Sequence, residues 1–136
     1  MPSWRRGSKN NQTAVIFPGQ GSEKLGWARI LEPGTRERLF REVDEVLSKD
    51  PRFCSRLKYL LTLDPDKLPE KRKIALQAEL NDTRFAQMAL WIVSCGWWDE
   101  FKQRTERVPS YLMGLSAGEY AALYAARVLG FKGGTL

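Results

Sequence analysis

The chain has 136 residues, enough for one compact domain with a buried core and too few for a second domain of ordinary size. Hydrophobic residues make up 43% and charged residues 28%, a balance that excludes wholesale disorder. The net charge of +6 favours anionic partners such as nucleic acid, phosphorylated cofactors or an acidic protein, although a solvated surface gives the same count.

The N-terminus forms a separate basic segment. It contains Arg5, Arg6 and Lys9, and no acidic residue occurs among the first twenty positions. This bias is that of a mitochondrial presequence, and an untargeted tail has the same composition. We therefore expect a basic tail over residues 1–12, a folded part over residues 13–136, and a mitochondrial or cytoplasmic location. No apolar run is long enough to span a bilayer, and no motif for binding nucleic acid occurs.

The first predicted element is a strand over residues 13–17, whose apolar, partly β-branched run is typical of a strand buried on both faces in a parallel sheet. The segment Phe17-Pro18-Gly19-Gln20-Gly21-Ser22 predicts a tight loop, because glycine permits backbone conformations and close approaches that other residues resist. It lacks the Lys and Ser/Thr that end a Walker A loop. The loop places Gln20 at the carboxyl end of the strand.

Three helices are predicted next. Apolar residues recur at helical spacing over residues 35–48, and shorter helices are predicted over residues 53–61 and 69–80. We expect these helices to shield one side of the sheet.

A longer helix is predicted over residues 83–101, where the sequence is apolar nearly all round. Such a helix is typical of a core, although its tryptophans also suit a surface that binds a partner or a cofactor. Cys95 lies in this helix and Cys54 in an earlier one, and neither has a CxxC partner or a histidine beside it. We expect two free, buried or half-buried thiols and no metal site.

The last predicted elements are a strand over Tyr111–Met113, a turn with the sequence Gly114-Leu115-Ser116-Ala117-Gly118, and a helix over residues 117–129 that Gly130 ends. Strand, sharp turn and helix form the context that a GxSxG nucleophile elbow requires. The tail, residues 131–136, is too short and too rich in glycine to hold another element.

The elbow carries the candidate chemistry. It would lift the Ser116 hydroxyl above the sheet, where the backbone amide of Ala117 can donate to an oxyanion. A loop amide at Gln20 would supply the second donor, an arrangement that suits acyl transfer. A serine needs a base, most often histidine, and the chain contains none. GxSxG also occurs by chance in ordinary turns, so this motif alone does not decide the function.

Three sequence blocks together resemble a known family. They are the loop at residues 17–22, the segment Asn81-Asp82-Thr83-Arg84-Phe85-Ala86-Gln87, and the elbow continued to Leu123. In this order they resemble the N-terminal part of malonyl-CoA:acyl carrier protein transacylases, over residues 14–131. The resemblance implies an α/β fold: a partial α/β-hydrolase-like acyltransferase core, with a short parallel sheet flanked by helices.

The resemblance also implies a reaction. A serine takes a malonyl group from coenzyme A and passes it to the phosphopantetheine thiol of acyl carrier protein, in fatty acid biosynthesis. Ser116 matches the nucleophile of the family, and Gln20 and Ala117 match its backbone oxyanion donors. The coenzyme A thioester is a substrate, and no covalently bound cofactor is implied. The positive net charge agrees with two anionic partners, coenzyme A and acyl carrier protein.

The chain departs from the family in several respects. Leu115 stands where histidine is usual, and Arg127 does not match the arginine that binds the substrate carboxylate. That arginine, the catalytic histidine, the ferredoxin-like subdomain and the later strands all belong to sequence beyond the elbow that has no counterpart here. We expect an unpaired sheet edge and an uncovered apolar face. The chain then corresponds to a fragment, a short product or a subunit that another chain complements, and it is inactive alone.

Three functions follow from the sequence. The first is an acyl carrier protein S-malonyltransferase, represented by its nucleophile half. The second is a non-catalytic protein of the same origin that binds coenzyme A or acyl carrier protein. The third is another serine acyl hydrolase that uses the same elbow.

Overall fold

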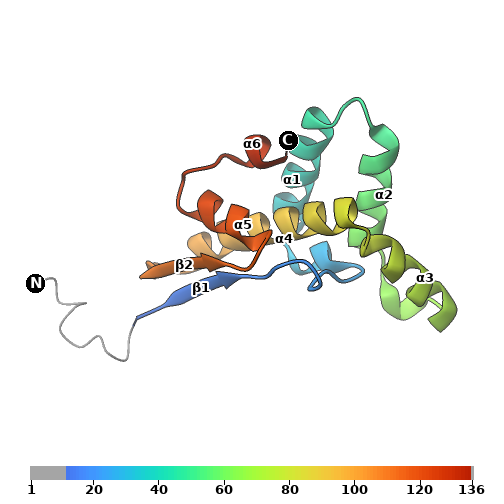
Figure 1. The fold of residues 1–136 in the computed structure, drawn as a ribbon, viewed down its shortest axis with the longest axis horizontal. Coiled ribbons are helices and arrows are strands. Elements are labelled where there is room, and N and C mark those ends of the chain that lie inside the picture. The colour runs from blue at the N-terminus through green and yellow to red at the C-terminus, as the bar shows by residue number, and fades with distance from the viewer. Residues whose placement is uncertain (1–11, 136) are drawn as a thin grey trace, which may run out of the picture.

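Two strands and six α-helices make up the α/β fold of residues 12–135, which the computed structural model describes (Figure 1). The elements are β1 (Ala14–Phe17), α1 (Pro33–Val46), α2 (Pro51–Thr62), α3 (Glu70–Leu80), α4 (Thr83–Arg104), β2 (Tyr111–Gly114), α5 (Gly118–Ala125) and α6 (Phe131–Thr135), with 3-10 helices at Trp27–Ile30 and Pro65–Lys67. Residues 1–11 of the predicted basic tail lie outside the described residues, so the location inferred from that tail stays a prediction.

The helices before residue 105 form where the sequence predicts them, each with ends shifted by no more than three residues. Side-chain caps fix two of the starts. The Asp50 carboxylate accepts a hydrogen bond from the Phe53 amide at 3.2 Å at the start of α2, and the Asp82 carboxylate accepts one from the Arg84 amide at 3.2 Å at the start of α4. Each cap satisfies an amide that has no partner within its helix, which stabilises the helix by about 1 kcal/mol.

The two strands pair in parallel, with Ile16 opposite Met113. Val15 and Phe17 point to one face, where α5 and Trp98 of α4 cover them. Ile16 and Met113 point to the other face and remain 58% and 53% exposed. The prediction that the first strand is buried on both faces is therefore wrong within residues 12–135, where helices cover one side of this sheet and leave Ile16 exposed.

The larger core lies away from the sheet. Helices α1, α2 and α3 pack on α4 around fully buried leucines such as Leu39, Leu57 and Leu80. Figure 1 shows α4 running between this helical group and the end of the molecule that holds β1, β2 and α5. The expectation that the first three helices shield the sheet is wrong, since α4 and α5 do so.

Helix α4 is a core helix, as its apolar sequence predicts. Most of its residues between Ala86 and Trp98 are buried; Gln87 and Trp97 are exposed, Trp97 to 40%, and Met88 is half-buried. Cys54 and Cys95 are both free and buried, which confirms the prediction for the thiols. Burial is the main cause that raises the pKa of each thiol above its ordinary value.

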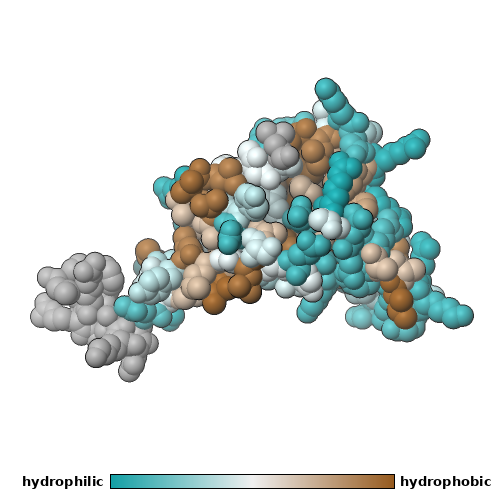
Figure 2. Space-filling model, in the orientation of Figure 1, coloured by the Kyte–Doolittle hydropathy of each residue, from teal (hydrophilic) through white to brown (hydrophobic). Residues whose placement is uncertain are grey.

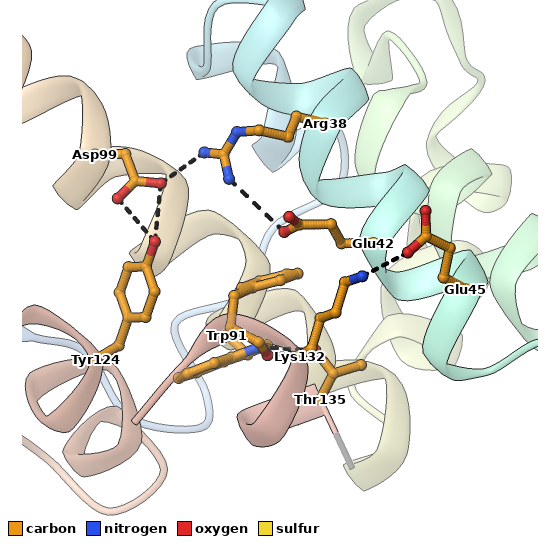
Figure 3. Close-up of polar contacts among 9 residues, drawn as sticks. Arg38, Glu42, Glu45, Trp91, Asp99, Tyr124, Lys132 and Thr135 are labelled. Atoms are coloured by element: carbon orange, nitrogen blue, oxygen red, sulfur yellow. Dashed lines mark hydrogen bonds and ion pairs between the residues drawn. The ribbon is translucent and has the colours of Figure 1, made fainter. Parts of the chain in front are cut away.

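The C-terminal part differs from the prediction. Helix α5 ends at Ala125, four residues earlier than expected, because Arg127 adopts a left-handed conformation with φ 61°. The tail then forms the short helix α6, where the sequence predicts no element. Its Phe131 ring stacks on Trp91 at a centroid distance of 5.6 Å, and Trp91 Nε1 donates to Thr135 Oγ1 at 3.2 Å (Figure 3).

A polar network fastens α5 and α6 to the helical core (Figure 3). The Tyr124 hydroxyl of α5 lies 2.9 and 3.0 Å from the two carboxylate oxygens of Asp99, which also accepts a hydrogen bond from Arg38 Nη2 at 2.6 Å. Lys132 of α6 pairs with Glu45 of α1 at 2.7 Å. The helix that follows Ser116 is thereby tied to α1 and α4.

Apolar surface gathers at the sheet end of the molecule, whereas the helical end is mostly hydrophilic (Figure 2). Tyr111, Met113 and Leu115 are more than half exposed there, beside Ile16. This confirms the expected uncovered apolar face within residues 12–135. None of the helices that the structure describes is long and apolar enough to cross a membrane.

Candidate active site

Ser116 adopts the strained backbone of a nucleophile elbow. Its φ is 51°, in the left-handed region that costs a residue other than glycine about 1–2 kcal/mol. The turn is closed by hydrogen bonds from the Gly118 amide to the Leu115 carbonyl at 2.9 Å and from the Glu119 amide to the Ser116 carbonyl at 3.0 Å. The sharp turn between β2 and α5 that the GxSxG motif predicts is therefore present.

The glycines on either side of Ser116 allow this turn to pack tightly. A Cβ atom on Gly114 would overlap the backbone of Gly118, and one on Gly118 would lie 2.5 Å from the Phe17 carbonyl oxygen. The Leu115 amide donates to that same Phe17 oxygen at 3.1 Å, which extends the pairing of β2 with β1. The elbow is thus seated on the carboxyl end of β1.

The loop after β1 meets the elbow and the start of α4. A Cβ atom on Gly19 would lie 2.5 Å from the Leu115 carbonyl oxygen, so the loop backbone packs directly on the elbow. The Gln20 amide group donates through Nε2 to the Thr83 hydroxyl at 3.4 Å. The buried Glu23 carboxylate accepts the Gly21 amide at 2.7 Å and holds the far side of the loop.

The two backbone amides predicted to bind an oxyanion are available. Within residues 12–135, neither the Gln20 nor the Ala117 amide donates a hydrogen bond to a protein acceptor. The Ser116 hydroxyl also has no hydrogen-bond partner among the described residues, and its side chain is exposed. The site therefore presents a candidate nucleophile and two candidate donors, and no described residue lies beside Ser116 as a base.

A pocket of about 780 Å³ opens beside the elbow. This volume lies in the range of small-molecule sites. Ser116 and Ala117 line it, whereas Gln20 does not. The other lining residues come from the end of α1, from α2, α4 and α5, and from the C-terminal segment: Leu47 directly after α1, then Phe53, Arg84, Gln87, Met88, Trp91, Glu119, Tyr120, Leu129, Gly133, Gly134 and Thr135.

Two polar residues that line this pocket have no role predicted from the sequence. Arg84 and Gln87 lie on α4 and face the pocket that Ser116 lines. The available signal was their place in segment 81–87, one of the three blocks that carry the family resemblance. Arg84 forms an ion pair with Asp50 at 2.9 Å, and its hydrogen bond is the main cause that lowers the pKa of that carboxyl below the ordinary value. Among residues 12–135, no cluster of three His, Cys, Asp or Glu could hold a metal ion.

Comparison with known proteins supports the family resemblance. No protein-family model matches the chain. A malonyl CoA-acyl carrier protein transacylase of Bacillus subtilis is 32% identical over 90% of this chain, and a crystal structure of an acyl carrier protein S-malonyltransferase from Vibrio cholerae is 31% identical with a TM-score of 0.66 over 90% of the chain. The chain matches the N-terminal part of the malonyl-CoA:acyl carrier protein transacylase family.

The match to the transacylases covers only part of those proteins. The chain spans 27% of the Bacillus subtilis relative and 35% of the Vibrio cholerae structure. A second Bacillus subtilis relative, the polyketide biosynthesis malonyl CoA-acyl carrier protein transacylase PksC, is 32% identical over 88% of this chain, which spans 35% of it. The family resemblance and the partial acyltransferase fold are confirmed. The roles of Ser116, Gln20 and Ala117 stay predictions.

Proposed function

We propose that this chain forms the nucleophile and oxyanion part of an acyl carrier protein S-malonyltransferase. One observation carries the proposal: the three sequence blocks of the resemblance meet in space. Gln20 contacts Thr83, Gly19 packs on the elbow, and Arg84 lines the same pocket as Ser116. A chance GxSxG turn gives no reason for the other two segments to converge on it.

The proposed reaction has two transfers. The Ser116 oxygen attacks the thioester carbonyl of malonyl-CoA, a bond forms between that oxygen and the acyl carbon, and the carbon–sulfur bond breaks. The amides of Gln20 and Ala117 stabilise the oxyanion that develops in between. Coenzyme A leaves with the proton of the serine. The phosphopantetheine thiol of acyl carrier protein then attacks the serine ester, and Ser116 regains a proton.

The base for these proton transfers has to come from elsewhere. The chain has no histidine, and no described residue bonds the Ser116 hydroxyl. A complementing segment or subunit would supply the base, and the uncovered sheet face beside Ile16 and Met113 offers it apolar surface to pack on. Without it we expect slow acylation and little turnover. Free imidazole, as a base in solution, should speed the acylation step.

The test is incubation of the purified chain with malonyl-CoA, followed by intact mass measurement and peptide mapping. We expect one malonyl adduct, located on Ser116 and absent in Ser116→Ala. Ser110→Ala is the matched control, since Ser110 is also an exposed serine at one end of β2. An adduct elsewhere, or one that persists in Ser116→Ala, would contradict the assignment of the nucleophile.

A second candidate is a binding protein that has kept this fold without its chemistry. The observation that favours it is the unpartnered Ser116 hydroxyl in a chain without histidine. Binding of acyl carrier protein or coenzyme A, measured by calorimetry, together with no adduct after prolonged incubation with imidazole would support this candidate over the enzyme.

A further inference from the structure

The pocket beside Ser116 contains a single basic side chain. Among the described residues that line it, Arg84 is the only positively charged side chain and Glu119 the only acidic one. Much of the remaining wall is apolar and comes from Leu47, Phe53, Met88, Trp91 and Leu129. An anionic group that enters this pocket therefore meets one cationic side chain, that of Arg84.

Two contacts hold the Arg84 guanidinium in place. Its Nη1 forms an ion pair with Asp50 Oδ2 at 2.9 Å, and its central carbon lies 3.8 Å from the centroid of the Phe53 ring. Stacking occupies the face of the guanidinium and leaves the N–H groups along its edge open. The side chain is 56% exposed. Arg84 is therefore pre-organised and still has donors for a ligand.

Asp50 does not depend on Arg84 for a partner. Its other oxygen, Oδ1, accepts the Phe53 amide at 3.2 Å as the cap of α2. A carboxylate at this end of a helix is also stabilised by the helix dipole. If a ligand accepts the hydrogen bonds of Arg84 in place of Asp50, the Asp50 carboxylate still accepts the Phe53 amide and still contacts solvent. Ligand binding therefore does not leave a buried charge without a partner.

We propose that Arg84 is a specificity-determining residue that binds an anionic group of the thioester that acylates Ser116, an inference that rests on the proposed function. The guanidinium edge suits carboxylates and phosphates, which it can bind through two hydrogen bonds. A thioester of coenzyme A offers both: a carboxylate on a dicarboxylic acyl group, and the phosphates of the carrier. A neutral thioester without phosphates gains nothing from Arg84.

The test measures the second-order rate of Ser116 acylation by intact mass. The substrates are malonyl-CoA, acetyl-CoA and the N-acetylcysteamine thioesters of malonate and acetate, which lack phosphates. The variants are Arg84→Met, Arg84→Lys, Asp50→Asn and Arg52→Met. Asn is also a good helix cap, so Asp50→Asn removes the ion pair and keeps Arg84. Arg52 is an exposed arginine of α2 that does not line this pocket.

We expect Arg84→Met to slow acylation by thioesters that carry the bound anion about 10- to 100-fold, the usual range for a lost hydrogen bond to a charged group. If Arg84→Met slows acylation by both malonyl thioesters, Arg84 binds the acyl carboxylate. If it slows acylation by both coenzyme A thioesters, Arg84 binds the phosphates. Arg84→Lys should retain part of the preference, that is, of the faster acylation by thioesters that carry the bound anion. Arg52→Met should keep it whole, and Asp50→Asn should keep most of it, because the stacking on Phe53 still holds Arg84.

Equal slowing of all four thioesters by Arg84→Met would overturn the inference, because it would mark a general loss of structure. The same loss in Asp50→Asn would also overturn it, since Arg84 would then act only as the partner of Asp50. In both cases the proposed function survives, because the wild-type chain is still acylated. A wild-type chain that no thioester acylates refutes the proposed function and this inference together.

Discussion

Arg127→Gly should stabilise the chain. Arg127 follows α5 with φ 61°, and the amides around it close the helix end: the Arg127 amide donates to the Tyr124 carbonyl at 3.0 Å and the Val128 amide to the Leu123 carbonyl at 2.9 Å. This is the left-handed position after a helix at which glycine is strongly favoured. The Arg127 side chain is exposed, so the substitution changes mainly the backbone energy.

The magnitude follows from two opposing terms. A residue with a Cβ atom pays about 1–2 kcal/mol in the left-handed region. Glycine removes this cost and adds about 0.5–1 kcal/mol of backbone entropy to the unfolded chain. The net gain in the free energy of unfolding is about 0.5–1 kcal/mol, which corresponds to a rise in Tm of about 2–5 °C for a chain of this length. Thermal unfolding followed by circular dichroism measures it.

The control for Arg127→Gly is Arg127→Ala, which removes the same charge and keeps the Cβ atom. We expect no gain from Ala and a smaller gain from Arg127→Asn, because asparagine tolerates this region better than most residues. If the Gly and Ala variants melted at the same temperature, the side chain and not the backbone would be responsible, and the reasoning from φ would be refuted.

Four further outcomes can be measured. Ser116→Gly should raise Tm by a similar amount and abolish the malonyl adduct, whereas retained labelling would contradict the elbow. Leu57→Ala should cost about 2–5 kcal/mol in urea unfolding, because Leu57 is fully buried, and the partly exposed Leu123→Ala should cost much less. Burial, and after it the neighbouring Asp99 carboxylate, raises the pKa of Tyr124 in the folded chain. The neutral tyrosine therefore stabilises the fold fully below the pKa of the unfolded chain, near ~10, and this contribution declines as the pH rises further. Tyr124→Phe should reduce the loss of stability at alkaline pH. Cys95, whose thiol pKa burial raises, should react with a thiol reagent near pH ~8 only after unfolding.

The sequence predicts the elements that have a clear period. The helix over 35–48 forms where apolar residues repeat at helical spacing. The helix over 83–101 forms where a long apolar run suits a core helix, and the Asp82 cap fixes where it begins. The sequence predicts the position of the strand over 13–17 correctly, and it predicts its burial wrongly. Its two faces look alike in the sequence, and only the position of α5 in space decides which face is covered.

The C-terminal part could not be predicted because tertiary packing decides it. Gly133 and Gly134 disfavour a helix by intrinsic propensity, yet α6 forms. A Cβ atom on Gly134 would overlap the Trp91 ring, so the glycine that weakens the helix is also the residue that lets it pack on α4. The early end of α5 depends on Arg127, which has no intrinsic preference for the left-handed region.

The candidate site also combines residues that local sequence patterns place and a residue that tertiary contacts place. The positions of Ser116 and of the Gln20 loop follow from local glycine patterns, and the sequence predicts both. The place of Arg84 in the pocket follows from its contacts with Phe53 of α2 and with Asp50, the cap of that helix, which both lie more than thirty residues earlier in the chain. No local pattern reports such a contact, so the candidate nucleophile was predictable and the candidate specificity residue was not.

The strain at Ser116 bears on which part of the proposed reaction this chain would perform. A left-handed serine persists only where its surroundings determine the backbone fully, and here contacts around Gly19, Gly114 and Gly118 do so within residues 12–135. The nucleophile and the two available amides are therefore positioned without the base. In the proposed reaction the base acts on the proton and the elbow on the oxyanion, so the two contributions are separable: this chain would set the geometry of acylation, and the rate of turnover would depend on a base that its sequence, without histidine, does not supply.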